Sequence, residues 1–116
     1  MYVLFVILNA VDYLEDILAG FVNEEISGAT ILDSQGMGSA IANSENESMP
    51  LFRSFQSLLS DSHPYSKTIF TVLENEQMVE KAVAVVQDVV DGISDTGVGF
   101  MFTVPIGKIY QMNSEE

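Results

Sequence analysis

The feature that most constrains the fold is a strand–helix–strand pattern that occurs twice, on either side of a long segment without periodicity. The first unit covers residues 2–35, the segment without periodicity covers residues 39–65, and the second unit covers residues 67–104. At 116 residues, the chain is long enough for one core and too short for two. We therefore expect a single domain, 1–116.

Three of the predicted strands are apolar on both of their alternating faces. Residues 2–8 show this pattern, and so do residues 67–73 and 100–104. A strand with two apolar faces has to be covered on both. The second strand is predicted for residues 29–35, and residues 108–112 are a candidate edge strand.

Two amphipathic helices are predicted, one in each unit. In residues 13–24 apolar side chains recur at helical spacing, and Asp12 is the expected N-cap of a capping box with Glu15. Asn75 is the expected N-cap of the second helix. The buried stripe of that helix comprises Met78, Val79, Ala82, Val83, Val86, Val89 and Val90. This element order predicts an α+β fold, a ferredoxin-like βαββαβ sandwich whose antiparallel sheet has two helices on one face.

The predicted helices cover one face of the sheet and leave the other without cover. The strands nevertheless carry large apolar residues on both faces, and the sequence offers no third helical layer. Burial of the second face between identical subunits resolves this conflict. We predict a stable homo-oligomer.

Residues 39–65 form the predicted long loop between the second and third strands. A connection of this length in a small domain is either functional or disordered. After Pro50, a common helix starter, Phe52, Phe55 and Leu58 fall on one face of a possible short helix. Two interpretations stay open: the helix packs on its own domain, or it docks on a protein partner in the helix-in-groove manner.

The net charge of −13, with only four lysines and arginines, argues against binding to nucleic acid or to an anionic membrane surface. Cysteine is absent, which excludes disulfides and thiolate metal sites and fits a cytoplasmic location. The apolar run 2–8 has no basic residues before it and is interrupted at Asn9, so it is interpreted as a buried strand. We expect no membrane insertion.

Two short glycine segments are the candidate ligand-binding elements. Gly36-Met37-Gly38 follows the second strand, and Gly97-Val98-Gly99 precedes the last one. Glycine allows the backbone to turn at positive φ and to bring its N–H groups close to a ligand. Each segment alone is a weak motif.

Together with their surroundings, these segments resemble the PII family of trimeric signalling proteins, known from nitrogen regulation. The resemblance rests on Gly28-x-Thr30 with a strand running to residues 36–38, and on residues 96–105, Thr-Gly-Val-Gly-Phe-Met-Phe-Thr-Val-Pro. The family has Gly-Met-Thr, then Gly-Phe-Gly before its long T-loop, and Gly-Asp-Gly-Lys-Ile-Phe-Val-x-Pro in its phosphate-binding B-loop and last strand. The similarity covers nearly the whole chain apart from the loop.

The resemblance implies a signal-transduction protein, a homotrimer that binds a small effector in clefts between subunits. PII proteins bind ATP or ADP there, sense 2-oxoglutarate with Mg-ATP, and dock on partners through the T-loop. Thr30 matches the threonine that contacts the nucleotide base, and Gly36 and Gly38 match the turn beside it. Gly97 and Gly99 match the B-loop glycines. The implied ligand-binding set is completed by Met37 and Val98, and residues 39–65 correspond to the T-loop.

The cationic residues of the family are not matched. Phe100 replaces the B-loop lysine, Val98 replaces the aspartate between the glycines, and Ser39-Ala40 replaces an Arg-Gln pair. Residues 111–113 stand where the family has Arg-Thr-Gly. Each lost charge-assisted contact costs on the order of 1.5–3 kcal/mol of phosphate binding. The sequence therefore argues against classical ATP and 2-oxoglutarate sensing and indicates a different effector, which it does not name.

Enzymatic and metal-dependent functions receive little support. His63 is the only histidine, and the chain lacks both a Gly-x-Ser-x-Gly motif and a Walker A lysine. Residues 91–95 lack the alternating ligands of a calcium loop. Asp33 is interpreted as a solvent-facing strand residue, with a cleft carboxylate as the alternative. We expect a regulator that is not an enzyme and holds no metal; the alternative is a ligand-free oligomeric scaffold or accessory protein.

Overall fold

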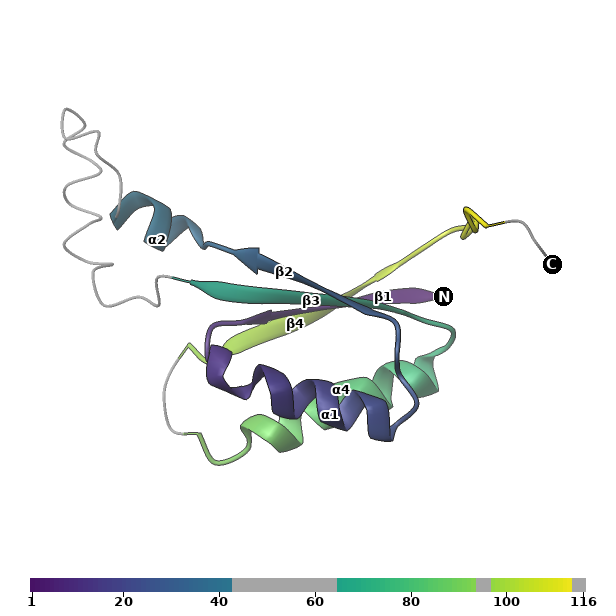
Figure 1. Ribbon diagram of the computed structural model, residues 1–116, viewed down its shortest axis with the longest axis horizontal. Helices are drawn as coiled ribbons and strands as arrows, with labels where there is room; N and C mark the ends of the chain where they lie inside the picture. The colour runs from purple at the N-terminus through teal and green to yellow at the C-terminus, as the bar shows by residue number, and fades with distance from the viewer. Residues whose placement is uncertain (43–64, 94–96, 114–116) are drawn as a thin grey trace.

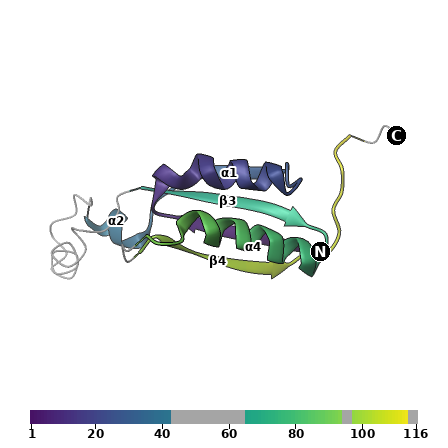
Figure 2. The same cartoon turned by 90° about the horizontal axis from the view of Figure 1, so that it is seen from below.

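The computed structural model describes residues 1–42, 65–93 and 97–113. Its helices and strands are β1 (Tyr2–Leu8), the 3₁₀ turn η1 (Val11–Tyr13), α1 (Leu14–Asn23), β2 (Ala29–Ser34), α2 (Met37–Ala42), β3 (Ser66–Leu73), α4 (Glu76–Val90) and β4 (Gly99–Pro105). The strands form one antiparallel sheet in the order β2-β3-β1-β4. Helices α1 and α4 lie side by side on one face of it (Figures 1 and 2). This α+β arrangement is compatible with a ferredoxin-like fold and confirms the expected layers.

The core lies between the sheet and the two helices. Strand β1 directs Leu4, Val6 and Leu8 to this side, where each is at most 2% exposed. The helices and neighbouring strands complete the cluster with Ile17, Phe21, Ile26, Ile69, Leu73, Ala82 and Val86. Full burial of one such large aliphatic or aromatic side chain contributes about 1.5–3 kcal/mol, so this layer supplies most of the stability of the domain.

The predicted cap of α4 is confirmed, and the predicted cap of α1 is wrong. The Asn75 side chain accepts a hydrogen bond of 2.9 Å from the Met78 N–H at the start of α4. Asp12 instead lies inside η1, and the N-cap of α1 is Tyr13, which makes no side-chain cap hydrogen bond. The reason is that the chain enters α1 through a 3₁₀ turn, which occupies the position of the expected capping box with Glu15.

Two predicted segments also differ from the structure. The long loop was expected to begin at residue 39, but the helix α2 continues to Ala42. The candidate edge strand 108–112 is wrong, because residues 106–113 form no strand. The chain leaves the sheet after Pro105, where the Ile106 N–H donates a 3.1 Å hydrogen bond to the Met1 carbonyl. Residues 43–64, with the possible helix after Pro50, lie outside the described residues.

Helix α1 ends in a Schellman motif with an unusual residue at its turning point. The Ile26 N–H donates to the Phe21 carbonyl (2.8 Å), and the Glu25 N–H donates to the Val22 carbonyl (2.9 Å). Both Ile26 and Phe21 are buried, which supplies the hydrophobic contact of the motif. Glu25 has a φ of 64°, a left-handed conformation that glycine adopts more readily than any other residue.

We expect the substitution Glu25→Gly to raise the free energy of unfolding by about 1 kcal/mol, because glycine relieves the left-handed strain. Urea unfolding followed by circular dichroism measures the change. Glu24→Gly is the matched control, since Glu24 has a φ of −96° and the same charge. That control should lower the stability, and equal effects of the two variants would contradict the assignment of strain to Glu25.

Candidate functional site

The two glycine segments lie at the same end of the sheet but at opposite edges. Strand β2 ends at Ser34, two residues before Gly36, and β4 begins at Gly99. Both strands run antiparallel to their neighbours. Strands β3 and β1 lie between them, so the strand ends are separated by three spacings, about 14 Å. Thr30 lies near the start of β2, away from this end of the sheet, and pairs with Phe70. Within one subunit, the structure does not bring the predicted ligand-binding residues together.

The segment at residues 36–38 differs from the expected turn. The described glycines with positive φ are Gly92, Gly97 and Gly99, so the expectation of positive φ is wrong for Gly36 and Gly38. Met37 and Gly38 instead form the start of α2, and the Gly36 carbonyl accepts a 3.0 Å hydrogen bond from the Ala40 N–H. After β2 the chain enters the helix α2, in place of the loop that the Gly-x-Gly pattern predicted.

The segment at residues 97–99 is held by the end of β1. The backbone N–H groups of Asn9 and Ala10 donate to the Val98 carbonyl at 2.8 and 3.1 Å. The Asn9 side-chain amide donates to the Gly97 carbonyl at 3.0 Å. These contacts fix two carbonyls of the segment against the sheet. Asn9 is a positioning residue that the sequence patterns did not identify.

Gly99 is required by close backbone packing. Its φ is 151°, and a Cβ at this position would lie 2.2 Å from the Ile7 carbonyl oxygen, which belongs to the backbone. Gly97 also has a positive φ, of 81°, but an added Cβ there would meet no atom within 4 Å. Backbone packing alone therefore explains why residue 99 is a glycine. It does not explain Gly97, because the space beside Gly97 is open.

A small apolar cavity of ≈110 Å³ adjoins this segment. Every residue lining it is apolar or glycine, including Val98, Phe100 and, at the end of α4, Val90. The last turn of α4 has no basic residue. No lysine or arginine in that turn therefore offsets the negative end of the helix dipole. The surroundings of the cavity disfavour a phosphate and favour an uncharged apolar group.

The face of the sheet away from α1 and α4 is rich in aromatic residues, and neither of these two helices covers it (Figures 1 and 2). We call it the open face; by register it comprises Val3, Phe5, Ile7, Thr30, Leu32, Ser34, Ser66, Thr68, Phe70, Val72, Phe100, Phe102 and Val104. The Phe5 ring stacks on Phe102 with centroids 5.0 Å apart and lies 5.8 Å from Phe70. Phe100 is 60% exposed and Phe102 is 43% exposed. None of these strand positions carries a charged side chain.

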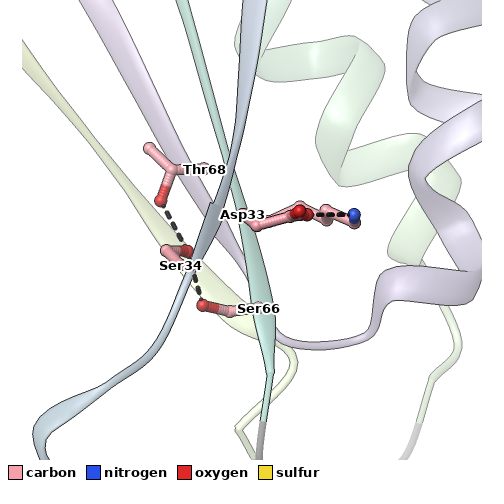
Figure 3. A network of polar contacts seen from close by, with 5 residues as sticks. Asp33, Ser34, Ser66 and Thr68 are labelled. Carbon is pink, nitrogen blue, oxygen red and sulfur yellow. Dashed lines mark hydrogen bonds and ion pairs between the residues drawn. The ribbon is translucent and has the colours of Figure 1, made fainter.

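Three hydroxyl groups gather at the β2–β3 edge of the open face (Figure 3). We call them the hydroxyl cluster: the Ser34 hydroxyl lies 2.7 Å from that of Ser66 and accepts a 2.9 Å hydrogen bond from Thr68. Asp33 points to the helix side, where it forms an ion pair with Lys67 (Figure 3). With an 86% exposed side chain, Asp33 is the solvent-facing strand residue that the sequence favoured. The hydroxyl cluster was missed because residues 34 and 66 are far apart in the chain.

At the other end of the β2–β3 pair, a wider hollow of ≈440 Å³ is lined by side chains of both charges, including Glu24, Glu74 and Lys81. Residues 1–42, 65–93 and 97–113 contain no group of three acidic or histidine side chains placed to hold a metal ion. The candidate partner-docking residues Phe52, Phe55 and Leu58, together with His63, lie outside the described residues.

In comparisons with known proteins, no family model matches the chain. No curated protein matches it either. None of the helices in the described parts of the chain combines the length and the apolar composition needed to cross a bilayer.

We expect Gly99→Ala to lower the free energy of unfolding by at least about 2 kcal/mol, because the new Cβ collides with a backbone oxygen. Gly36→Ala is the matched control, since its added Cβ meets no atom within 4 Å. That control should change the stability by about 0.5 kcal/mol or less. Chemical unfolding without any ligand makes the comparison, and a Gly99→Ala protein of normal stability would contradict the packing explanation.

Proposed function

We propose that the protein is a PII-like regulator, a cytoplasmic homotrimer that binds a small effector between subunits and docks a partner through residues 39–65. The open face is the observation that supports this most directly. It places large aromatic side chains in water on a domain that has no further described layer to cover them. Contiguous exposed apolar surface of this kind is typical of protein interfaces.

Charge supports a second copy of the chain as the cover. The protein has a net charge of −13, yet the strand positions of the open face are uncharged. Two copies can therefore approach through these faces without direct contact between carboxylates. An anionic partner surface would gain nothing from such a face and would be repelled by the rest of the molecule.

The positions of the glycine segments support a ring. A ligand that contacts both segments needs the β2 edge of one copy beside the β4 edge of another, because they are far apart within one subunit. Contacts between two different edges are heterologous, and they close into a ring when the rotation allows. From the PII resemblance we expect three subunits. Each subunit would be a ferredoxin-like sandwich with a T-loop-like insertion.

We expect that the effector bound in the cleft between subunits is not a polyphosphate. The cavity beside Val98 and Gly99 is apolar, Val90 at the end of α4 lines it, and Phe100 stands where the family has a lysine. The predicted loss of ATP and 2-oxoglutarate sensing follows from the same chemistry. We expect an uncharged effector with a small apolar group.

A ligand-free oligomeric scaffold is the second candidate, and one observation favours it. Gly99 and the carbonyls of Gly97 and Val98 are explained by packing and hydrogen bonding within the subunit. In a scaffold, the open face would still be buried between copies, but no metabolite would bind. Neither candidate involves catalysis.

The substitution Phe102→Glu should dissociate the oligomer, because it places a carboxylate in the middle of the proposed interface. We expect the dissociation constant to rise roughly 100-fold or more, equivalent to about 2.8 kcal/mol. Sedimentation equilibrium measures it. Ala84→Glu, at an exposed position on α4, is the matched control and should leave the mass unchanged. Equal masses for both variants would exclude the open face as the interface.

A thermal-shift screen separates the regulator from the scaffold. The panel contains adenine nucleotides, 2-oxoglutarate, bicarbonate, divalent metals and uncharged metabolites with short aliphatic groups. A ligand at one hundred times its dissociation constant stabilises by about 2.7 kcal/mol, a shift of several degrees in Tm for a domain of this size. We expect a shift with an uncharged compound and none with ATP. A shift with ATP would refute the apolar-effector proposal, and no shift with any compound would favour the scaffold.

A further inference from the structure

An exposed methionine and the small apolar cavity lie at opposite edges of the sheet. Met37 is 76% exposed at the start of α2, a helix that lies beyond the end of β2 and away from α1 and α4 (Figure 1). The cavity of ≈110 Å³ lies beside Val98 and Gly99. A single exposed apolar side chain is ordinary on a protein surface. Met37 is of interest because a cavity of matching size and chemistry lies at the same end of the sheet.

The size of the cavity matches a methionine side chain. An engineered apolar cavity of about 150 Å³ in another protein takes benzene, with its six carbon atoms. By the same ratio, a cavity of ≈110 Å³ holds about four heavy atoms. The methionine side chain consists of Cβ, Cγ, Sδ and Cε. This unbranched, polarisable chain also adapts to irregular apolar gaps.

We propose that Met37 of one copy inserts into the cavity beside Val98 of the next copy and closes it until an effector displaces it. This inference rests on the proposed ring of subunits and deepens it, because it names how the effector site is regulated. The apolar group of the effector and the Met37 side chain compete for one cavity. Each site is then completed by a residue of a second copy.

The strand directions place Met37 and the cavity at the same end of such a ring. Strand β2 ends three residues before Met37, and β4 begins at Gly99, at the same end of the sheet. Within one subunit, β3 and β1 separate these two edges by about 14 Å. In a ring, the β2 edge of one copy lies beside the β4 edge of the next, and this separation disappears when the rotation axis runs along the strands. Met37 therefore meets the cavity of a neighbouring copy.

Charge permits this contact. Residues 34–42 and residues 97–105 carry no charged side chain, in a chain of net charge −13. Asp88 and Asp91 lie on either side of Val90 in the sequence, and Val90 lines the cavity. These carboxylates repel an anionic group but do not oppose a neutral thioether. The cavity therefore suits a methionine better than it suits a charged side chain or a phosphate.

Disulfide trapping tests the contact, because the sequence has no native cysteine to interfere. One batch of protein carries Met37→Cys and a size tag, and a second batch carries Val98→Cys. The batches are mixed under subunit exchange and oxidised. We expect the mixed disulfide to form at least tenfold faster than with Gln77→Cys, an exposed control position on α4. A rate equal to that of the control, or a disulfide that forms only when both cysteines are in one chain, overturns the inference.

A double-mutant cycle tests whether Met37 acts through the cavity. Met37→Ala should raise the dissociation constant of the assembly at least tenfold. Val90→Phe fills the cavity from within its own chain, so in this background Met37→Ala should have less than a threefold further effect. Sedimentation equilibrium measures the four proteins, and circular dichroism checks that each is folded. Equal effects of Met37→Ala in both backgrounds overturn the inference.

Xenon tests whether Met37 closes the cavity, because xenon binds apolar cavities of this kind. In xenon NMR, the assembled Met37→Ala protein should bind xenon at least tenfold more tightly than the unmodified assembly. Equal xenon affinities overturn the inference and leave the proposed ring standing. If the unmodified chain is a monomer at every concentration, the proposed ring fails, and the Met37 inference fails with it.

Discussion

The sheet has two apolar faces, and the described helices cover only one of them. On the helix side, residues such as Leu4, Phe21 and Ile69 form a closed core that keeps the domain folded. On the other side, Phe5 stacks on Phe102, and neither α1 nor α4 covers the two rings. Apolar burial is the main favourable term in folding and in association, and for this reason we propose that the second face is an interface between copies of the chain.

The layers of this fold could be predicted from the sequence because they depend on periodicity. Alternating and helical patterns are local, and they correctly gave the four strands of the sheet, both covering helices and the Asn75 cap. Asp12 failed as a cap because a 3₁₀ turn intervenes before α1. The edge strand at 108–112 failed because β-branched and aromatic residues favour a strand only where a neighbouring strand is present to pair with them.

The candidate site was harder to predict for a physical reason. Glycine motifs in a sequence do not distinguish a backbone that approaches a ligand from a backbone that approaches another strand. Gly99 belongs to the second kind, since the Ile7 carbonyl occupies the space of its missing Cβ. Gly36 belongs to neither kind, because it leads into α2. The hydroxyl cluster and Asn9 escaped prediction because strand register, and not sequence distance, brings their partners together.

We propose that the open face is buried between copies of the chain. Sedimentation velocity of the unmodified protein over a wide concentration range tests it most directly. We predict one species with three times the 12.7 kDa mass of the chain. A single species of 12.7 kDa at every concentration would contradict the account, because the aromatic open face would then remain in water.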